Sequence, residues 1–100
     1  MTETQTISWI FLATALAAEQ GPATADSISG IADGINHAVP TTQELDTAFR
    51  WLVHKQLIEK AGNRYRLTKA GKTLMNRAAG DNSPIMSAWN KLDTLLENYG

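Results

Sequence analysis

The sequence has 100 residues, enough for one compact domain, and its 43% hydrophobic content excludes an intrinsically disordered chain. It contains no cysteine, which excludes a disulfide framework and every thiolate metal site. The net charge of −1 conceals an uneven distribution: residues 50–77 hold eight basic groups against one acid, which is +7, and all other residues together hold one basic group against nine acids, which is −8.

The first predicted element is a helix that runs from Thr6 to about Glu19 and is ended by Gly21-Pro22. Within it, residues 9–18 form an apolar run that is too short to span a bilayer. A secretory signal peptide needs basic residues ahead of such a run, but the first basic residue of the chain is Arg50. We therefore expect a buried helix in a cytoplasmic protein.

Apolar side chains occupy nearly the whole circumference of this helix: Ile7, Trp9, Ile10, Phe11, Leu12, Ala13 and Leu16. A helix that is apolar all round has to be covered on more than one side. One side would meet the domain core, and another would meet either a second subunit or the C-terminal helix of the same chain.

A second helix is predicted after Thr24, whose side chain would cap its start. The apolar positions of this helix recur at helical spacing, at Ile28, Ile31, Ala32 and Ile35. Gly30 and Gly34 lie on one stripe, which indicates close packing against another helix. In the connection that follows, residues 36–40, we expect His37 to be a turn or cap residue bonded to the backbone.

The third helix has the clearest predicted start, because Thr41-Thr42-Gln43-Glu44 forms a capping box in which the side chains of Thr41 and Glu44 each accept from the other's backbone amide. The predicted buried face comprises Leu45, Ala48, Phe49, Leu52 and Val53. Trp51 lies beside this face, where it would cover the edge of the core or belong to a partner surface. His54 is expected on the exposed flank.

A hairpin should follow, with Leu57-Ile58 in its first strand, Gly62-Asn63 as a two-residue turn and residues 65–67 in its second strand. Thr68 would then cap a fourth helix that ends at about Ala78. A fifth helix would follow Asn82-Ser83-Pro84, with Ser83 as its cap and Pro84 at the first helical position.

The fifth helix carries a heptad-like apolar stripe: Ile85, Ala88, Leu92, Leu95 and Tyr99, widened by Trp89 and Leu96. The wide stripe on the last helix and the apolar circumference of the first helix together make more apolar surface than one domain needs to bury, which favours a homodimer. The residues expected at its interface are Trp9, Phe11, Leu12, Ile85, Trp89, Leu92 and Leu96. The alternative is that both helices pack on their own domain.

Residues 41–74, TTQELDTAFRWLVHKQLIEKAGNRYRLTKAGKTL, resemble the recognition-helix-plus-wing half of winged helix-turn-helix proteins, small bacterial regulators of the multiple-antibiotic-resistance and phenolic-acid-repressor types among them. The resemblance covers about a third of the chain and rests on these residues: Glu44-Leu45, Ala48, Leu52, Leu57-Ile58 and Tyr65-x-Leu67-Thr68-x-x-Gly71-x-x-Leu74. It implies a mainly α fold with a small β-hairpin (α+β). One winged-helix domain would span residues 1–100, with its core at about 24–78 and helices 6–20 and 83–99 supporting dimerisation.

One position departs from that pattern. Such proteins commonly have glycine one place before the strand, where this chain has Gln56. Keeping the geometry would require a left-handed backbone at Gln56, at a cost of about 1–2 kcal/mol. The hairpin is also short, so the wing would reach less far.

In this family the third helix enters the DNA major groove and the wing touches the backbone or the minor groove. The resemblance therefore implies double-stranded DNA as the partner and a DNA-binding transcriptional regulator as the function. The residues carried over as DNA contacts are Thr42, Gln43, Asp46, Thr47, Arg50, Arg64, Arg66, Lys69 and Lys72. Gln43 would bind adenine, and Arg50 would bind guanine or phosphate. The cations of the hairpin and of the fourth helix would bind phosphates.

Two carboxylates, on Glu44 and Asp46, oppose this expectation because they lie where the helix would enter the groove. The alternative is a winged-helix module that binds protein and not DNA. No Gly-x-Ser-x-Gly, phosphate-cradling glycine loop or His-Glu-x-x-His motif is present, so we expect no enzyme activity. Neither His37 nor His54 has a Glu or Asp at helical ligand spacing that would complete a metal site, so we expect no metal and no cofactor. No polar cluster identifies a small-molecule effector.

Overall fold

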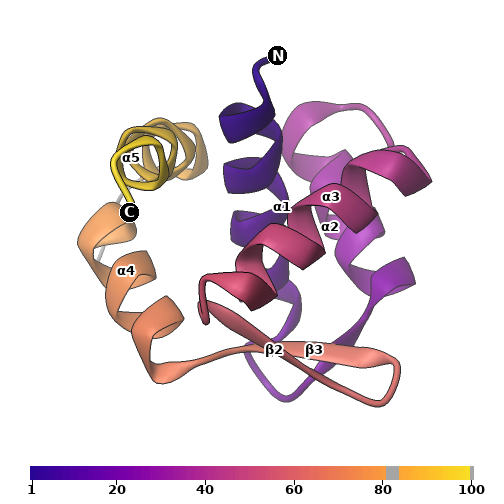
Figure 1. The fold of residues 1–100 in the computed structure, drawn as a ribbon. Coiled ribbons are helices and arrows are strands. Elements are labelled where there is room, and N and C mark those ends of the chain that lie inside the picture. Colours follow the sequence, from indigo (N-terminus) through magenta and orange to yellow (C-terminus); the bar gives the residue numbers. More distant parts are fainter. Residues whose placement is uncertain (81–83, 100) are drawn as a thin grey trace.

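The computed structural model describes residues 1–80 and 84–99. These residues form a mainly helical protein with a small antiparallel sheet (Figure 1). The elements in chain order are α1 (Glu3–Ala17), β1 (Ala23–Thr24), α2 (Ala25–Asn36), α3 (Thr42–His54), β2 (Ile58–Ala61), β3 (Arg64–Leu67), α4 (Lys69–Ala79) and α5 (Ile85–Glu97). The α+β class expected from the sequence is therefore found.

Helix α1 is the central element, and its buried stretch runs without interruption from Ile7 to Thr14. It packs against α2, α3 and α5, which surround it (Figure 1). The hydroxyl groups of Ser8 and Thr14 are buried too, and each donates to a carbonyl of α1 itself. Of the two ways predicted to cover this helix, the structure shows the C-terminal helix of the same chain.

The start of α1 differs from the prediction by three residues. Helix α1 begins at Glu3 because Thr2 and Gln5 form a capping box, in which Thr2 Oγ1 accepts from the Gln5 amide at 3.1 Å and Gln5 Oε1 accepts from the Thr2 amide at 2.8 Å. The predicted start at Thr6 followed the apolar run, whereas the polar first turn also belongs to the helix.

Helix α2 begins as predicted, with Thr24 Oγ1 accepting from the Ser27 amide at 3.2 Å. His37 ends it in the left-handed conformation, and its amide donates to the Asp33 carbonyl, which confirms the predicted cap. The packing predicted for Gly30 and Gly34 is wrong, because both are exposed and a β-carbon at either would meet nothing within 4 Å. Ile31, at the edge of the stripe, is also exposed.

Helix α3 has the predicted capping box at its start and buries Ala48, Phe49 and Leu52. Val53 does not belong to the buried face, because 40% of it is exposed. Gln56 adopts the left-handed conformation, with φ 61°, as the prediction required. His54 is exposed as expected, and Trp51 is half-buried against the edge of the core, which agrees with the first of the two roles considered for it.

The sheet has the strand order β1-β3-β2 and is antiparallel throughout. The hairpin pairs Glu59 with Arg66 and Lys60 with Tyr65, and Gly62-Asn63 forms its turn as predicted. Strand β1 was not predicted, because two residues that pair with β3 carry no local pattern.

Helices α4 and α5 complete the fold. Thr68 caps α4 as predicted, through a bond of 3.1 Å from the Gly71 amide. Pro84 is the residue before α5 and not its first helical residue, so that prediction was wrong by one position, and the predicted cap Ser83 lies outside the described residues.

Six of the seven residues expected at a dimer interface are instead part of the core of this chain: Trp9, Phe11, Leu12, Trp89, Leu92 and Leu96. The prediction is wrong for them because α5 packs on α1. The rings of Trp9 and Trp89 stack with centroids 6.2 Å apart, and their indole N–H groups donate to the carbonyls of Ala32 and Gln5. Ile85 remains exposed, at 48%.

Candidate nucleic-acid interface

The outer face of α3 is open to solvent along its length. The five α3 residues predicted to contact DNA are all exposed: Thr42, Gln43, Asp46, Thr47 and Arg50. They face outward because Ala48, Phe49 and Leu52 turn the opposite face of the helix into the core.

The two carboxylates on this helix are both engaged locally. Glu44 Oε1 accepts from the Thr41 amide at 2.8 Å as part of the capping box. Asp46 Oδ2 lies 3.2 Å from Arg50 Nη2, one turn along the helix, with both side chains more than half exposed. An exposed pair of this kind contributes only about 0–1 kcal/mol, so the Arg50 guanidinium can exchange Asp46 for another anion.

The hairpin presents different side chains on its two faces, because successive side chains of a strand point to opposite sides. Tyr65 faces α3, where its ring stacks on that of Phe49 with centroids 4.1 Å apart. Lys60 is paired with Tyr65 and therefore lies on the same face, with its Nζ 5.8 Å from the centre of the Tyr65 ring. Lys60 is thus the hairpin cation that faces α3, and it was not among the residues predicted to contact DNA.

Arg64 and Arg66, which were predicted to contact DNA beside α3, lie on the other face of the hairpin. Arg66 Nε is 2.6 Å from Glu59 Oε1, its cross-strand partner. Arg64 Nη1 donates to the Pro22 carbonyl at 3.3 Å. The structure therefore does not bring these two arginines together with the outer face of α3, because Tyr65 between them points the opposite way.

A hollow of about 500 Å³ lies between α3 and the hairpin, beside the stacked rings of Phe49 and Tyr65. We call it the α3–hairpin groove, and it is lined by Asp46, Phe49, Arg50, Val53, His54, Lys60 and Tyr65. Stacked aromatic rings lie among its walls, and Arg50, His54 and Lys60 provide donors around them. A second hollow shares Val53 and Lys60 with the groove and extends it to Lys69 at the start of α4.

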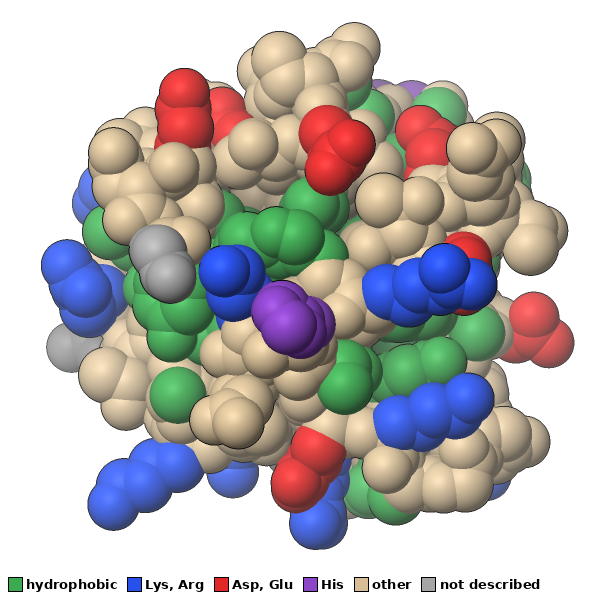
Figure 2. Space-filling view, in the orientation of Figure 1, with side chains coloured by type: hydrophobic (Ala, Val, Ile, Leu, Met, Phe, Trp, Pro, Cys, Tyr) green, Lys and Arg blue, Asp and Glu red, His purple; other side chains and the backbone are tan. Residues whose placement is uncertain are grey.

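Five of the eight cations of residues 50–77 line hollows that lie on two sides of the hairpin. Arg50, Lys60 and Lys69 line the groove and its extension, whereas Arg66 and Lys72 line a cavity between α1 and α4. Figure 2 shows Lys and Arg side chains mainly across the middle and lower part of one face of the molecule, with Asp and Glu side chains mainly above them. This distribution concentrates positive charge in the middle and lower part of this face.

No protein-family model, curated protein or solved structure matches this chain. Among the residues that the structure describes, no three His, Asp or Glu side chains lie close enough together to hold a metal ion. Within the same residues, no helix has the length and apolar character needed to cross a membrane.

Proposed function

We propose that this chain is a winged helix-turn-helix domain that binds double-stranded DNA and regulates transcription in the bacterial cytoplasm. The helix order and the strand order β1-β3-β2 support the fold assignment, since they place a hairpin directly beside the third helix. In this proposal α3 is the helix that enters the major groove and the hairpin is the wing.

The observation that carries the proposal is the α3–hairpin groove. It joins an unobstructed helix face to a hairpin through Arg50, His54 and Lys60, with Lys69 adjoining. Cations along a groove can pair with the phosphates of a DNA strand. Phosphate contacts supply most of the affinity of such proteins. Gln43 and Thr47 on the outer face of α3 are then placed to read base edges.

Fluorescence anisotropy of a labelled random-sequence duplex, titrated at several salt concentrations, tests the proposal. The double variant Arg50→Gln with Lys60→Gln should bind more weakly, and the slope of log K against log salt should become shallower by about 2, because each lost phosphate contact removes about 0.9. The matched control is Arg77→Gln with Lys91→Gln, which removes the same charge from a hollow beside α4 and α5. Its slope should stay closer to that of the wild type.

The second candidate is a module that binds protein. It is favoured by the engagement of Arg50 and Arg66 with carboxylates, which reduces the charge offered to a phosphate. Absence of wild-type binding to the duplex at low salt and micromolar protein would reject DNA recognition and leave this candidate.

We also propose that the protein forms a homodimer through the start of α5. Ile85 and Met86 are both about half exposed there, and they are large apolar side chains that the core does not cover. Light scattering across a concentration series tests this proposal, and Met86→Glu should shift the mass toward the monomer. A monomeric mass at all concentrations would reject it.

A further inference from the structure

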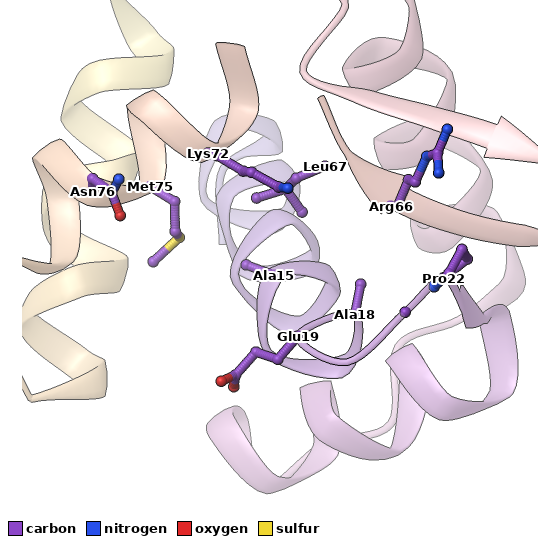
Figure 3. A pocket seen from close by; sticks show the side chains of 10 residues that line it. Ala15, Ala18, Glu19, Pro22, Arg66, Leu67, Lys72, Met75 and Asn76 are labelled. Atoms are coloured by element: carbon purple, nitrogen blue, oxygen red, sulfur yellow. The ribbon is translucent and has the colours of Figure 1, made fainter. Parts of the chain in front are cut away.

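A cavity of about 480 Å³ lies where the end of α1, the turn before β1, the end of β3 and α4 meet (Figure 3). We call it the α1–α4 cavity. Its apolar walls comprise Ala15, Ala18, Pro22, Leu67 and Met75. Its volume and apolar walls are typical of small-molecule sites, in which a few polar groups fix the orientation of the ligand.

Two side chains of opposite charge line this cavity without pairing. Lys72 comes from α4 and Glu19 from the segment after α1. In the part of the chain that the structure describes, neither side chain makes an ion pair, so the two lie more than 4.0 Å apart. Figure 3 shows Lys72 above and Glu19 below, with Ala15 at a height between them.

Arg66 also lines the cavity, but it is already engaged. Its guanidinium pairs with Glu59 and is turned away from the side chains of Ala15 and Ala18 (Figure 3). The charges left for a ligand are therefore one ammonium and one carboxylate at separate places, with Asn76 as a further hydrogen-bonding group.

We propose that the α1–α4 cavity binds a small zwitterion whose two charges are separated by an apolar body, namely a dipeptide of apolar residues. Its carboxylate would pair with Lys72, its ammonium with Glu19, and its side chains would contact the apolar walls. A simple anion would leave Glu19 as a repulsive neighbour. A free amino acid offers one side chain to the apolar walls, whereas a dipeptide offers two.

A ligand series tests this proposal independently of DNA binding. Leucyl-leucine is titrated into the ¹⁵N-labelled protein, and its dissociation constant is compared with those of N-acetyl-leucyl-leucine, leucyl-leucine amide and leucine. The acetyl compound lacks the ammonium and the amide lacks the carboxylate, so each should bind about tenfold more weakly than the dipeptide. Chemical-shift changes should centre on the amides of Ala18, Leu67 and Met75.

Two charge variants assign each group of the ligand to its partner. Lys72→Gln should abolish the discrimination between leucyl-leucine and its amide, and Glu19→Gln should abolish the discrimination against the acetyl compound. Lys91→Gln, an exposed cation that does not line this cavity, is the control and should leave both ratios unchanged. Equal affinity for the dipeptide, its two derivatives and leucine, or no shift changes at millimolar dipeptide, would overturn the proposal.

Discussion

The backbone of α4 at Gly71 packs directly on the carbonyl oxygen of Leu57, so that a β-carbon at position 71 would overlap that oxygen. The same carbonyl accepts from the Thr68 amide at 3.0 Å, and Thr68 Oγ1 donates to the Gln56 carbonyl at 2.6 Å. The first turn of α4 is thereby fixed to the junction between α3 and β2. This junction sets where Lys69 lies relative to the α3–hairpin groove.

Gly71→Ala should lower the free energy of unfolding by about 2–3 kcal/mol, because the added methyl group forces the two backbone segments apart. Gly34→Ala is the matched control, since Gly34 lies exposed in α2 with nothing within 4 Å of a β-carbon. It should raise the free energy of unfolding by about 0.5–1 kcal/mol through the higher helix propensity of alanine. Urea unfolding followed by circular dichroism measures both, and equal effects would contradict the close contact at Gly71.

Gln56→Gly should stabilise the protein by about 1 kcal/mol, because Gln56 has φ 61° and glycine adopts this conformation without steric cost. The neighbouring variant Lys55→Gly is the control, since Lys55 has φ −81° and should only lose stability on substitution. Thermal and urea unfolding should rank the three proteins as Gln56→Gly, wild type, Lys55→Gly. A lower midpoint for Gln56→Gly would show that its side chain contributes more than its backbone costs.

The elements that the sequence predicted well are those with local signals. The start of α3 could be predicted because Thr41 and Glu44 are three residues apart and act on each other's amides. Thr2 and Gln5 carry a signal of the same form, yet the predicted start followed the apolar run instead. Strand β1 could not be predicted, because its two residues are stabilised by pairing with residues 64 and 65, far along the chain.

The errors at the candidate site and the dimer interface have a tertiary cause. Strand alternation places Lys60 and Tyr65 on one face and Arg66 on the other, but only the stacking of Tyr65 on Phe49 determines which face meets α3. Similarly, the apolar stripe that contains Trp89 predicts that this face of α5 is buried, but it does not show which element packs on it. In this chain the cover is α1.

Trp89→Ala should destabilise the protein by about 3–5 kcal/mol, because it removes a buried ring that stacks on Trp9 and a hydrogen bond of 3.1 Å to the Gln5 carbonyl. Lys91→Ala lies two residues later in α5, where the side chain is exposed, and should change the free energy of unfolding by less than about 0.5 kcal/mol. Urea unfolding followed by far-ultraviolet circular dichroism compares them. A small loss for Trp89→Ala would show that α5 contributes little to the fold.

Asp46→Asn should tighten binding to duplex DNA several-fold if α3 enters the groove as proposed. The substitution keeps the size of the side chain, removes one negative charge from the outer face of α3 and releases the Arg50 guanidinium from the pair at 3.2 Å. Glu97→Gln, which removes one exposed carboxylate at the end of α5, is the charge control and should have a much smaller effect, since screening limits charges to about 10 Å at 0.1 M salt. Anisotropy titrations at one salt concentration compare the three proteins. Equal gains for the two variants would mean that only the net charge matters, whereas weaker binding by Asp46→Asn would mean that Asp46 orients Arg50 toward the DNA.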